Sequence, residues 1–420
     1  MKFYPWLLPA LVCCILSTGC NKSTDLTSPS NVFLRMFPSD TSYQTGGAFQ
    51  LADGNFVVYG FPPENNSYPP LIIKCDSKGT IIWKNPLSPA FHYCTVKSIS
   101  ISDSILMAVG TTGTAASVIS VCRINASSGI VIEGSLKNYT VPDLVSGPLM
   151  PPLFERAESG SLLIAGTIEN KDKKEYYPFV LPVEENGVAK SPIVFDFNIP
   201  GWKLIMTRGL CKDNKGYTIS GSTYNADVTE TDPVISFCLR LDNNYDELWH
   251  TFLTDTKESI STKGMIVTES ESSIILFGSR GKSTYANTNI SDLIGTLYTQ
   301  QLDMEGNLSD TSGSYSDFMN LGHAGGLAET SDGGYIMSAT TNEMIDIYLV
   351  SSNHMYLLKL GKDLNEEWHR EFKGFNAFTA VSVEQTKDGG YLIGGYEHSG
   401  TFIFTMCLIK TDADGNIVLQ

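Results

Sequence analysis

Charged residues are scarce in this sequence, and basic residues are scarcer than acidic ones. Asp, Glu, Lys and Arg make up 18% of the 420 residues, and the formal net charge is −16. Nucleic acids and anionic membrane surfaces are bound by positively charged protein surfaces. The composition therefore argues against nucleic acid and against anionic lipid as the ligand.

Patterns that bind metals or form disulfides are also missing. The six histidines never occur at the spacing of metal ligands, and no C-x-x-C pair occurs among the nine cysteines. Cys75, Cys122, Cys238 and Cys407 fall in apolar, strand-like runs, which favours buried thiols over disulfides. No G-x-S-x-G motif precedes a helical pattern, and no Ser, His and Asp group has the setting of a nucleophile. We therefore predict no metal, no cofactor and no identifiable catalytic residue.

The apolar run near the N-terminus is too short to span a bilayer as a helix. This run, Phe3 to Leu16, follows a lysine, contains two prolines and leads through small residues to Cys20. Such a stretch is typical of a secretory signal peptide. The small residues before Cys20 resemble the lipobox of bacterial lipoproteins, although Ser17 stands where an aliphatic residue is usual. We predict a lipoprotein signal peptide at 1–19, then a lipidated Cys20 and a flexible tether over 20–30; an ordinary cleaved signal peptide is the alternative.

A repeated pattern fills most of the remaining chain. An apolar residue that follows a turn is itself followed, four positions later, by a small residue, and this happens seven times. The small residues are Gly60, Gly110, Gly166, Gly221, Gly278, Ala339 and Gly395, spaced by 50 to 61 positions. Internal repeats of this length indicate a solenoid, a propeller or a similar array.

Each repeat carries signals for four antiparallel strands. In the sixth repeat, Asp332-Gly333-Gly334 predicts a hairpin turn, because glycine accepts the positive φ that such turns need. Further strands are predicted at Met355 to Leu360 and at Trp368 to Phe372, with a polar turn between them. Four strands in 50 to 60 residues make one propeller blade. We predict an all-β protein, a single seven-bladed β-propeller of four-stranded antiparallel blades over 31–420, with the third repeat the most divergent.

Two further features of the repeats predict contacts between blades. Phe33 to Phe37 matches Trp368 to Phe372 in character, so this N-terminal strand is expected to complete the outer edge of the seventh blade and close the ring. Trp83, Trp249 and Trp368 occupy the same place in their repeats, which favours packing in the core or between blades over ligand binding.

The repeat motifs resemble those of a known group of proteins. The T-x-D-G-G-Y-x-x-x-G half (Thr386 to Gly395) and the K-x-D-x-x-G-x-x-x-W half (Lys74 to Trp83) look like the β-propeller lipoproteins of Bacteroidetes. The second half is also similar to quinoprotein-type repeats, and the Gly-Gly pair to kelch repeats. The resemblance implies a propeller fold and a cell-envelope location. Only three repeats keep the tryptophan, and the mature chain lacks the vicinal cysteines of quinoproteins, so no cofactor is carried over.

A binding site is expected where the connections are long and irregular. The second-to-third strand loops and the linkers between blades are such segments, and variable loops on a rigid scaffold commonly carry function. They are rich in aromatic residues, which suit stacking on sugar rings or anchoring a protein partner. The candidate ligand-binding residues are Trp202, Tyr68, Tyr176, Tyr177, Tyr224, Tyr285, Tyr396 and His92. For any one of them, packing within its own loop is the competing interpretation.

Three functions remain open from the sequence. The leading hypothesis is an outer-membrane lipoprotein, on the cell surface or the periplasmic side, that binds a glycan or an envelope protein and touches the membrane only through its lipid. The second is a polysaccharide-acting enzyme that uses loop carboxylates such as Glu64, Glu175, Asp227 and Asp232. The third is a structural component of an envelope complex.

Overall fold

A computed structural model describes the chain in segments from residue 31 to residue 417. The described ranges are 31–63, 68–87, 91–99, 103–112, 118–145, 151–157, 159–173, 175–197, 204–224, 234–255, 258–270, 272–281, 296–315, 322–346, 349–372, 377–399 and 403–417. They all belong to one compact unit, which spans Asn31–Gln420. Every secondary-structure element in these ranges is a strand, so none contains a helix long and apolar enough to cross a membrane.

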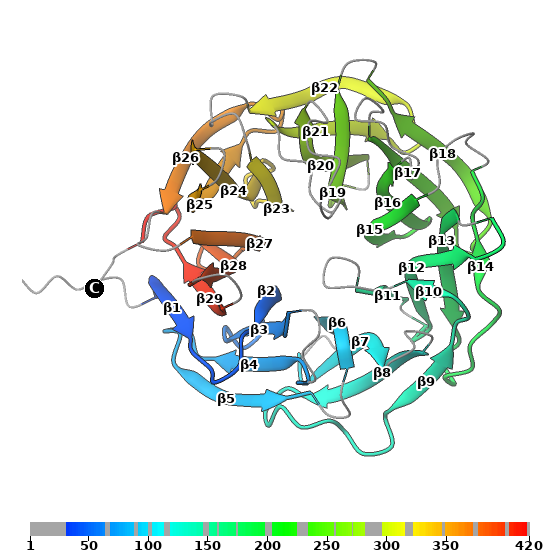
Figure 1. Ribbon diagram of the computed structural model, residues 1–420, viewed down its shortest axis with the longest axis horizontal. Helices are drawn as coiled ribbons and strands as arrows, with labels where there is room; N and C mark the ends of the chain where they lie inside the picture. The colour runs from blue at the N-terminus through cyan, green and yellow to red at the C-terminus, as the bar shows by residue number, and fades with distance from the viewer. Residues whose placement is uncertain are drawn as a thin grey trace, which may run out of the picture. The chain divides into compact units, whose positions relative to one another are not determined.

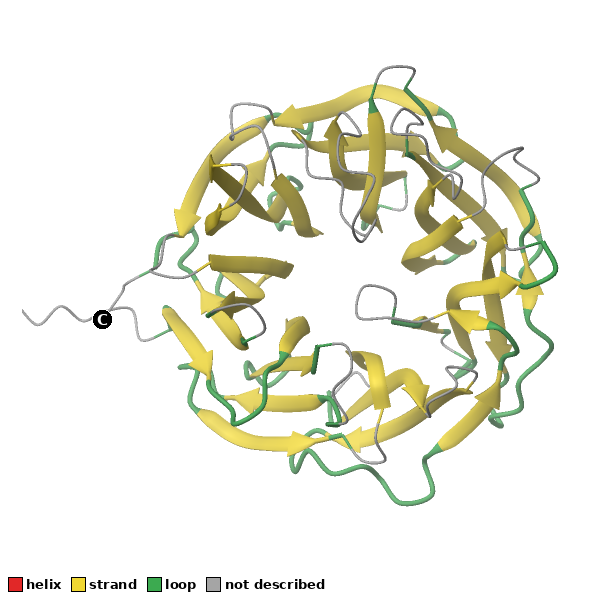
Figure 2. Ribbon diagram, viewed as in Figure 1, coloured by secondary structure: helices red, strands yellow, loops and turns green. Residues whose placement is uncertain are grey.

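The strands form seven sheets arranged around a central axis, as Figures 1 and 2 show. Blade 1 consists of β2 (Gln44–Gln50), β3 (Phe56–Phe61), β4 (Leu71–Cys75) and β5 (Ile81–Pro86). Blade 2 consists of β6 (Phe91–Ser98), β7 (Ile105–Thr112), β8 (Val118–Asn125) and β9 (Lys137–Thr140). Blade 3 consists of β10 (Leu144–Val145), β11 (Leu153–Arg156), β12 (Leu162–Asn170), β13 (Glu175–Val183) and β14 (Ile193–Val194). Blade 4 consists of β15 (Leu204–Asp213), β16 (Gly216–Tyr224), β17 (Ile235–Asp242) and β18 (Glu247–Leu253).

The remaining three blades follow the same order. Blade 5 consists of β19 (Ser259–Val267), β20 (Ser273–Gly281), β21 (Thr296–Asp303) and β22 (Leu308–Tyr315). Blade 6 consists of β23 (Gly322–Glu329), β24 (Tyr335–Asp346), β25 (Leu349–Leu360) and β26 (Glu366–Phe372). Blade 7 consists of β27 (Ala377–Gln385), β28 (Tyr391–His398), β29 (Phe404–Lys410) and β1 (Phe33–Phe37). The predicted seven-bladed propeller of four-stranded antiparallel blades is confirmed.

The ring closes in the predicted way. β1 pairs antiparallel with β29, with Phe33 opposite Lys410 and Phe37 opposite Met406. Figure 1 shows these first and last strands of the colour scale side by side at the outer edge of blade 7. Blade 3, the most divergent repeat in sequence, is also the irregular blade in structure, because β10 and β11 pair with β12 as two separate segments of its first strand.

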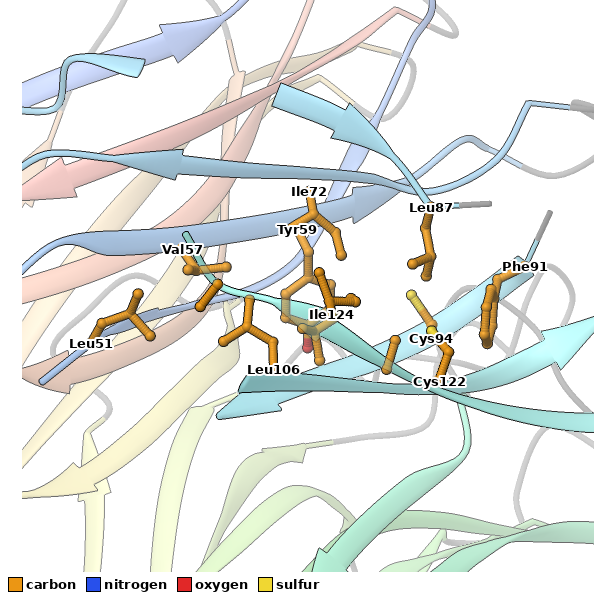
Figure 3. Close-up of a cluster of buried hydrophobic side chains, with 13 residues drawn as sticks. Leu51, Val57, Tyr59, Ile72, Leu87, Phe91, Cys94, Leu106, Cys122 and Ile124 are labelled. Atoms are coloured by element: carbon orange, nitrogen blue, oxygen red, sulfur yellow. The ribbon is translucent and has the colours of Figure 1, made fainter. Parts of the chain in front are cut away.

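The hydrophobic core is divided among the contacts between blades. Seven clusters of buried side chains occur, and each joins two consecutive blades. Figure 3 shows the cluster between blades 1 and 2, where Tyr59 and Ile72 face Phe91, Leu106 and Ile124. Since each blade buries both of its faces against its neighbours, its strands read as apolar runs such as β3, whose six residues are all buried.

The repeat tryptophans dock one blade on the next. Trp83 of blade 1 lies against the outer turn of blade 2, and its Nε1 donates a hydrogen bond to the carbonyl of Ala126 (3.2 Å). A Cβ added at Gly129 in that turn would lie 2.5 Å from the Trp83 ring, so only glycine fits beneath it. Trp249 and Trp368 lie in the same way on Gly306 and Gly415. The prediction of packing between blades is confirmed.

In six of the seven blades the small residue of the repeat lies opposite a β-bulge in the innermost strand; in blade 3, Gly166 lies between the residues of β12 that pair with β10 and with β11. In blade 5, for example, the register of β19 shifts between Thr262 and Gly264, and Thr262 pairs with Gly278. A bulge re-aims the local backbone, and here a Cβ on Gly278 would lie 2.0 Å from the carbonyl oxygen of Ser261. The recurrent glycine is therefore required by the close approach of a bulged inner strand.

In several blades the residue after this small residue carries a hydroxyl group. That hydroxyl forms a hydrogen bond with the next blade. Ser222, which follows Gly221, accepts the backbone N–H of Thr262 at 2.9 Å. Thr167 accepts the N–H of Thr207 at 3.1 Å, and Thr340 accepts that of Ala380 at 2.9 Å. We call these contacts the interblade hydroxyl bonds. They satisfy backbone N–H groups of the innermost strands, whose inner edge has no neighbouring strand.

In four blades a cationic side chain of the third strand is buried. An aspartate in the turn between the first and second strands forms an ion pair with it. Lys74, Arg240, Lys359 and Lys410 are all nearly inaccessible to solvent. Their partners are Asp53, Asp213, Asp332 and Asp388, at 2.6 to 3.0 Å. Burial alone would raise the pKa of Asp332, but hydrogen bonds from Thr330, Gly334 and Lys359 hold this pKa down to about 2. The two sequence halves of the repeat are thus joined by an ion pair.

Breaking the most buried of these ion pairs should destabilise the fold strongly. Arg240 and Asp213 are both 2% exposed, and Arg240 Nη2 donates to Asp213 Oδ1 at 2.6 Å. Asp213→Ala leaves the guanidinium buried without a counter-charge, which costs about 3–5 kcal/mol of unfolding free energy. Denaturant unfolding of the purified variant measures this loss.

The matched control is Lys171→Met, which breaks an exposed ion pair with Asp143. We expect it to change the unfolding free energy by less than about 1 kcal/mol. Equal effects of the two substitutions would contradict a structural role for the buried pairs.

Adding a methyl group to the repeat glycine should also destabilise the protein. In Gly278→Ala the new Cβ would collide with the Ser261 carbonyl, and we expect a loss of about 1–3 kcal/mol, as for other overpacked sites. Gly361→Ala is the control, because its Cβ would meet the movable side chain of Asp363 first. Thermal or denaturant unfolding measures this loss. If Gly278→Ala leaves the stability unchanged, the bulged inner strand can move to accommodate the methyl group and the prediction is wrong.

Candidate functional site

The ring has two different ends. At one end, which we call the loop end, lie the connections between second and third strands and the linkers between blades. At the other, the turn end, lie the short turns between first and second strands and between third and fourth strands. The sequence predicted the binding site at the loop end.

Three of the predicted site residues belong to three consecutive blades at this end. Tyr396 lies on β28 of blade 7, Tyr68 precedes β4 of blade 1, and His92 lies on β6 of blade 2. Tyr68 is 55% exposed, while Tyr396 and His92 are half-buried. The closure of the ring places the last blade beside the first, so that these residues belong to adjacent blades.

In blade 7, Tyr396 belongs to a cluster of three rings. The centroid of its ring lies 5.1 Å from that of His398 and 5.6 Å from that of Phe404. His398 and Phe404 are 4.6 Å apart in an edge-to-face arrangement, and the Thr379 hydroxyl lies 3.3 Å from His398 Nε2. Tyr396 and His398 remain partly accessible to solvent.

Tyr43 connects this cluster with Tyr68 in blade 1. Its backbone N–H donates to the carbonyl of Phe404 at 3.0 Å, and its hydroxyl donates to the carbonyl of Pro69 at 3.2 Å. Burial and the nearby Tyr68 hydroxyl both raise the pKa of Tyr43. Tyr68 is thus held on a loop whose position is fixed by contacts with blade 7.

A separate pair of rings joins blade 1 to blade 2. Phe61, the last residue of β3, makes an edge-to-face contact with Tyr93, and the ring centroids are 5.6 Å apart. His92 and Tyr93 lie in the bulge of β6, where the register shifts between Phe91 and Cys94. We define the aromatic arc as the aromatic and histidine residues of the loop end on blades 7, 1 and 2: Tyr396, His398, Phe404, Tyr43, Tyr68, Phe61, His92 and Tyr93.

Tyr176 and Tyr177 lie apart from the arc, on β13 of blade 3. Tyr177 is buried, its hydroxyl donates to a Glu175 carboxylate oxygen, and Lys173 Nζ lies 5.9 Å from the centre of its ring. Burial, followed by the hydrogen bond to Glu175, raises the Tyr177 pKa. Tyr176 is half-buried. Glu175, considered as a loop carboxylate, is thus engaged by Tyr177.

Other predicted residues fall outside the part of the chain that the structure describes. They are Cys20, Glu64, Trp202, Asp227, Asp232 and Tyr285. Tyr224 ends β16, and only its backbone is described. Tyr43, Phe61, Tyr93, His398 and Phe404 were not predicted as site residues. The sequence feature that could have identified them is their position near strand ends, next to predicted loops.

At the turn end lies a cavity that the sequence did not predict. It has a volume of about 320 Å³ and lies between the innermost strands of blades 2 and 3. Its lining combines polar residues (Lys97, Ser98, Asp103, Glu155 and Arg156) with apolar ones (Ile99, Phe154 and Ala157). The sequence analysis treated this end as structural because its turns are short.

A second polar feature of the turn end lies at the closure between blades 7 and 1. The Glu384 carboxylate of β27 accepts the backbone N–H of Gln50, and Asp103 accepts that of Ala52. The pKa of Glu384 is raised to about 7: burial is the main cause and the Asp103 charge adds to it, while the hydrogen bond from Gln50 acts in the opposite direction. Both carboxylates thus join neighbouring blades.

Metal ligands do not gather in the described ranges, where no three His, Cys, Asp or Glu side chains are placed to hold an ion. Six cysteines there are free thiols, five of them buried. Burial raises the pKa of Cys75 and of Cys122 to about 12, so these thiols are unreactive at neutral pH.

Comparison with known proteins adds information on the fold. No family model matches the sequence, and a search of curated proteins finds no match. Among solved structures, an ulvan lyase of polysaccharide lyase family PL25, bound to -[GlcA(1-4)Rha3S]-, has a TM-score of 0.58 at 8% identity, covering 90% of this chain and 96% of its own. Kuenenia stuttgartiensis hydrazine synthase has a TM-score of 0.53 at 10% identity, covering 90% and 98%. A protein of unknown function from Dyadobacter fermentans has a TM-score of 0.49 at 11% identity, covering 91% and 99%. At these identities the similarity concerns the fold alone.

Glu384 should make the stability of the protein depend on pH. Its pKa in the folded protein, about 7, lies above the value of about 4.3 expected in an unfolded chain. The folded state therefore binds this proton more tightly, and the stability that protonation provides is present below about pH 4.3 and lost as the pH rises through 7. Glu384→Gln keeps an oxygen acceptor for Gln50 and removes the buried charge.

We expect Glu384→Gln to raise the melting temperature relative to wild type at pH 8, with a gain that shrinks toward pH 4. Thermal melting of both proteins across this range measures the difference. A gain that is equal at all pH values would contradict the raised pKa.

Proposed function

We propose that this protein is a lipid-anchored β-propeller of the bacterial cell envelope that binds a glycan at its aromatic arc. The location rests on the apolar segment Phe3 to Leu16 and the small residues before Cys20. The binding role rests chiefly on one observation. Tyr396, Tyr68 and His92, predicted separately as ligand-binding, lie at the loop end of three consecutive blades, and other aromatic rings lie at the same end: His398 and Phe404 around Tyr396, and the Phe61–Tyr93 pair at blades 1 and 2.

The chemistry of the arc suits a sugar ligand. Aromatic rings offer flat apolar faces, and Tyr and His add polar edges that can hydrogen-bond. Sugars present the same combination, with apolar C–H faces and hydroxyl groups at the edges. Tyr68, at 55% exposure, provides an accessible ring, and Tyr396 and His398 provide partly accessible ones beside Glu397.

The charge of the chain favours a neutral glycan. The whole chain is acidic, with a formal net charge of −16. An anionic polysaccharide would be repelled by this field at low salt. A neutral polysaccharide is therefore the ligand class that fits both the rings and the charge.

The contacts behind the arc support a preformed site. Tyr43 is hydrogen-bonded to Phe404 and Pro69, and Ser42 Oγ accepts the Phe404 N–H at 2.6 Å. These bonds link blade 7 to blade 1 next to Tyr68. A site built on fixed rings loses less conformational entropy on binding than a mobile one.

The direct test is equilibrium binding of the full-length protein to a panel of neutral and anionic polysaccharides. We expect a neutral polysaccharide to bind. Tyr68→Ala and Tyr396→Ala should each weaken it by about tenfold, because removing a central aromatic contact costs about 1.4 kcal/mol or more. Leu248→Ala is the control, since Leu248 is an exposed apolar residue on the outer strand of blade 4.

The proposal fails if no polysaccharide binds, or if binding is the same in both tyrosine variants and in wild type. If an envelope protein binds instead and loses affinity in the tyrosine variants, the arc is a protein-binding surface and the glycan assignment is wrong.

A further inference from the structure

The cavity at the turn end is separate from the aromatic arc and has a different character. Its lining comes from β6 and the following turn of blade 2, and from β11 and the next residue of blade 3. Two basic and two acidic side chains line it. The inference below does not depend on the function proposed for the arc.

One of the two cations is already neutralised. Lys97 Nζ lies 2.5 Å from Glu155 Oε1 and 5.6 Å from the centre of the buried Phe154 ring. This ion pair joins blade 2 to blade 3 and forms one wall of the cavity. Since the opposite charges are in direct contact, Lys97 adds little net attraction for an anion.

The other cation keeps most of its hydrogen-bonding capacity. Arg156 has an exposed side chain, and its Nη1 donates to the carbonyl of Ile99 at 3.1 Å. In the described part of the chain no carboxylate forms an ion pair with it. A guanidinium has five N–H donors in a planar fork that matches a carboxylate, so Arg156 can still bind one through two parallel hydrogen bonds.

The lining also offers hydrogen-bond acceptors. Asp103 accepts the Ser98 hydroxyl through Oδ1 and the Ala52 N–H through Oδ2. These two bonds fix the orientation of the carboxylate, and an ionised carboxylate has about four lone-pair sites. Asp103 can therefore accept further hydrogen bonds from ligand hydroxyl groups.

The size of the cavity limits the ligand. A volume of about 320 Å³ is at the lower end of the range of about 300–1,000 Å³ typical of small-molecule sites. We propose that this cavity binds a small hydroxylated carboxylate, such as a single acidic sugar, with its carboxylate on Arg156 and its hydroxyl groups on Asp103 and Ser98. The ligand class follows from the two groups in one lining: a guanidinium with a single hydrogen bond to a carbonyl, and a carboxylate held in place by two hydrogen bonds.

The test uses the full-length protein and three simple probes: glucuronate, glucose and acetate. We expect saturable binding of glucuronate in calorimetry or ligand-observed NMR, and at least about tenfold weaker binding of glucose and acetate. Each of these two probes lacks one half of the proposed recognition, either the carboxylate or the hydroxyl groups.

Arg156→Gln should weaken glucuronate binding by at least about tenfold. Arg123→Gln is the matched control, because it removes the same charge from an exposed position on β8, away from the cavity. Thermal melting of both variants verifies that each is folded. Tyr68→Ala should leave glucuronate binding unchanged, which separates this site from the aromatic arc.

Three results would overturn the proposal. The first is the absence of glucuronate binding at millimolar concentration. The second is equal binding of glucuronate to wild type and Arg156→Gln. The third is equal affinity for acetate and glucuronate, which would reveal attraction of any anion without recognition of hydroxyl groups.

Discussion

The propeller depends on how the innermost strands are held at the central axis. An inner strand has no neighbour on its axial side, so its backbone N–H groups need other partners. The interblade hydroxyl bonds provide partners near the bulges, where Thr167, Ser222 and Thr340 each accept an N–H of the following blade. The recurrent glycine beside them admits the bulged strand. Loss of either feature would loosen one blade against the next, and a closed ring transmits such a change to both neighbours.

This frame explains why residues far apart in sequence can form one surface. Tyr68 and Tyr396 belong to the first and seventh blades, and Tyr43 brings them together through its bonds to Phe404 and Pro69. The closure of the ring by β1 and β29 places those two blades side by side. The loops of the loop end differ in sequence from blade to blade, while the strands behind them keep a common pairing order. At the turn end, neighbouring blades are joined by polar side chains instead: Asp103 and Glu384 each accept a backbone N–H of an adjacent blade.

The fold was largely predictable because its signals are local and repeated. The small residue at each of seven positions predicted the number of blades, and Phe33 to Phe37 predicted the closing strand. The buried ion pairs were not predicted, although a signal was present: Lys359 and Lys410 interrupt apolar runs at the same register, 27 and 22 residues after an aspartate of the first turn. A charge in a buried strand requires a counter-charge, and the aspartates of the turn motif were the available ones.

The site was less predictable, because composition shows which loops are aromatic without showing which residues meet. Tyr176 and Tyr177 are adjacent on one strand, so their side chains point to opposite faces and only one can be accessible on a given side. This rule alone predicts that the two tyrosines cannot both belong to one binding surface. In the structure Tyr177 is buried. The cavity beside Arg156 could not be predicted from the sequence, because its residues are ordinary charges at the ends of the innermost strands of two blades and in one adjoining turn. Their proximity depends on how blades 2 and 3 pack.

The central claim is that ligand binding occurs at the loop end on blades 7, 1 and 2. Hydrogen–deuterium exchange of the full-length protein, with and without a bound neutral polysaccharide, tests it most directly because it does not presuppose any residue. The account predicts added protection in segments 68–70, 91–93 and 396–404, with the bulged inner strands of blades 4 to 6 unchanged. Protection confined to the turn end or to the outer strands would contradict the account.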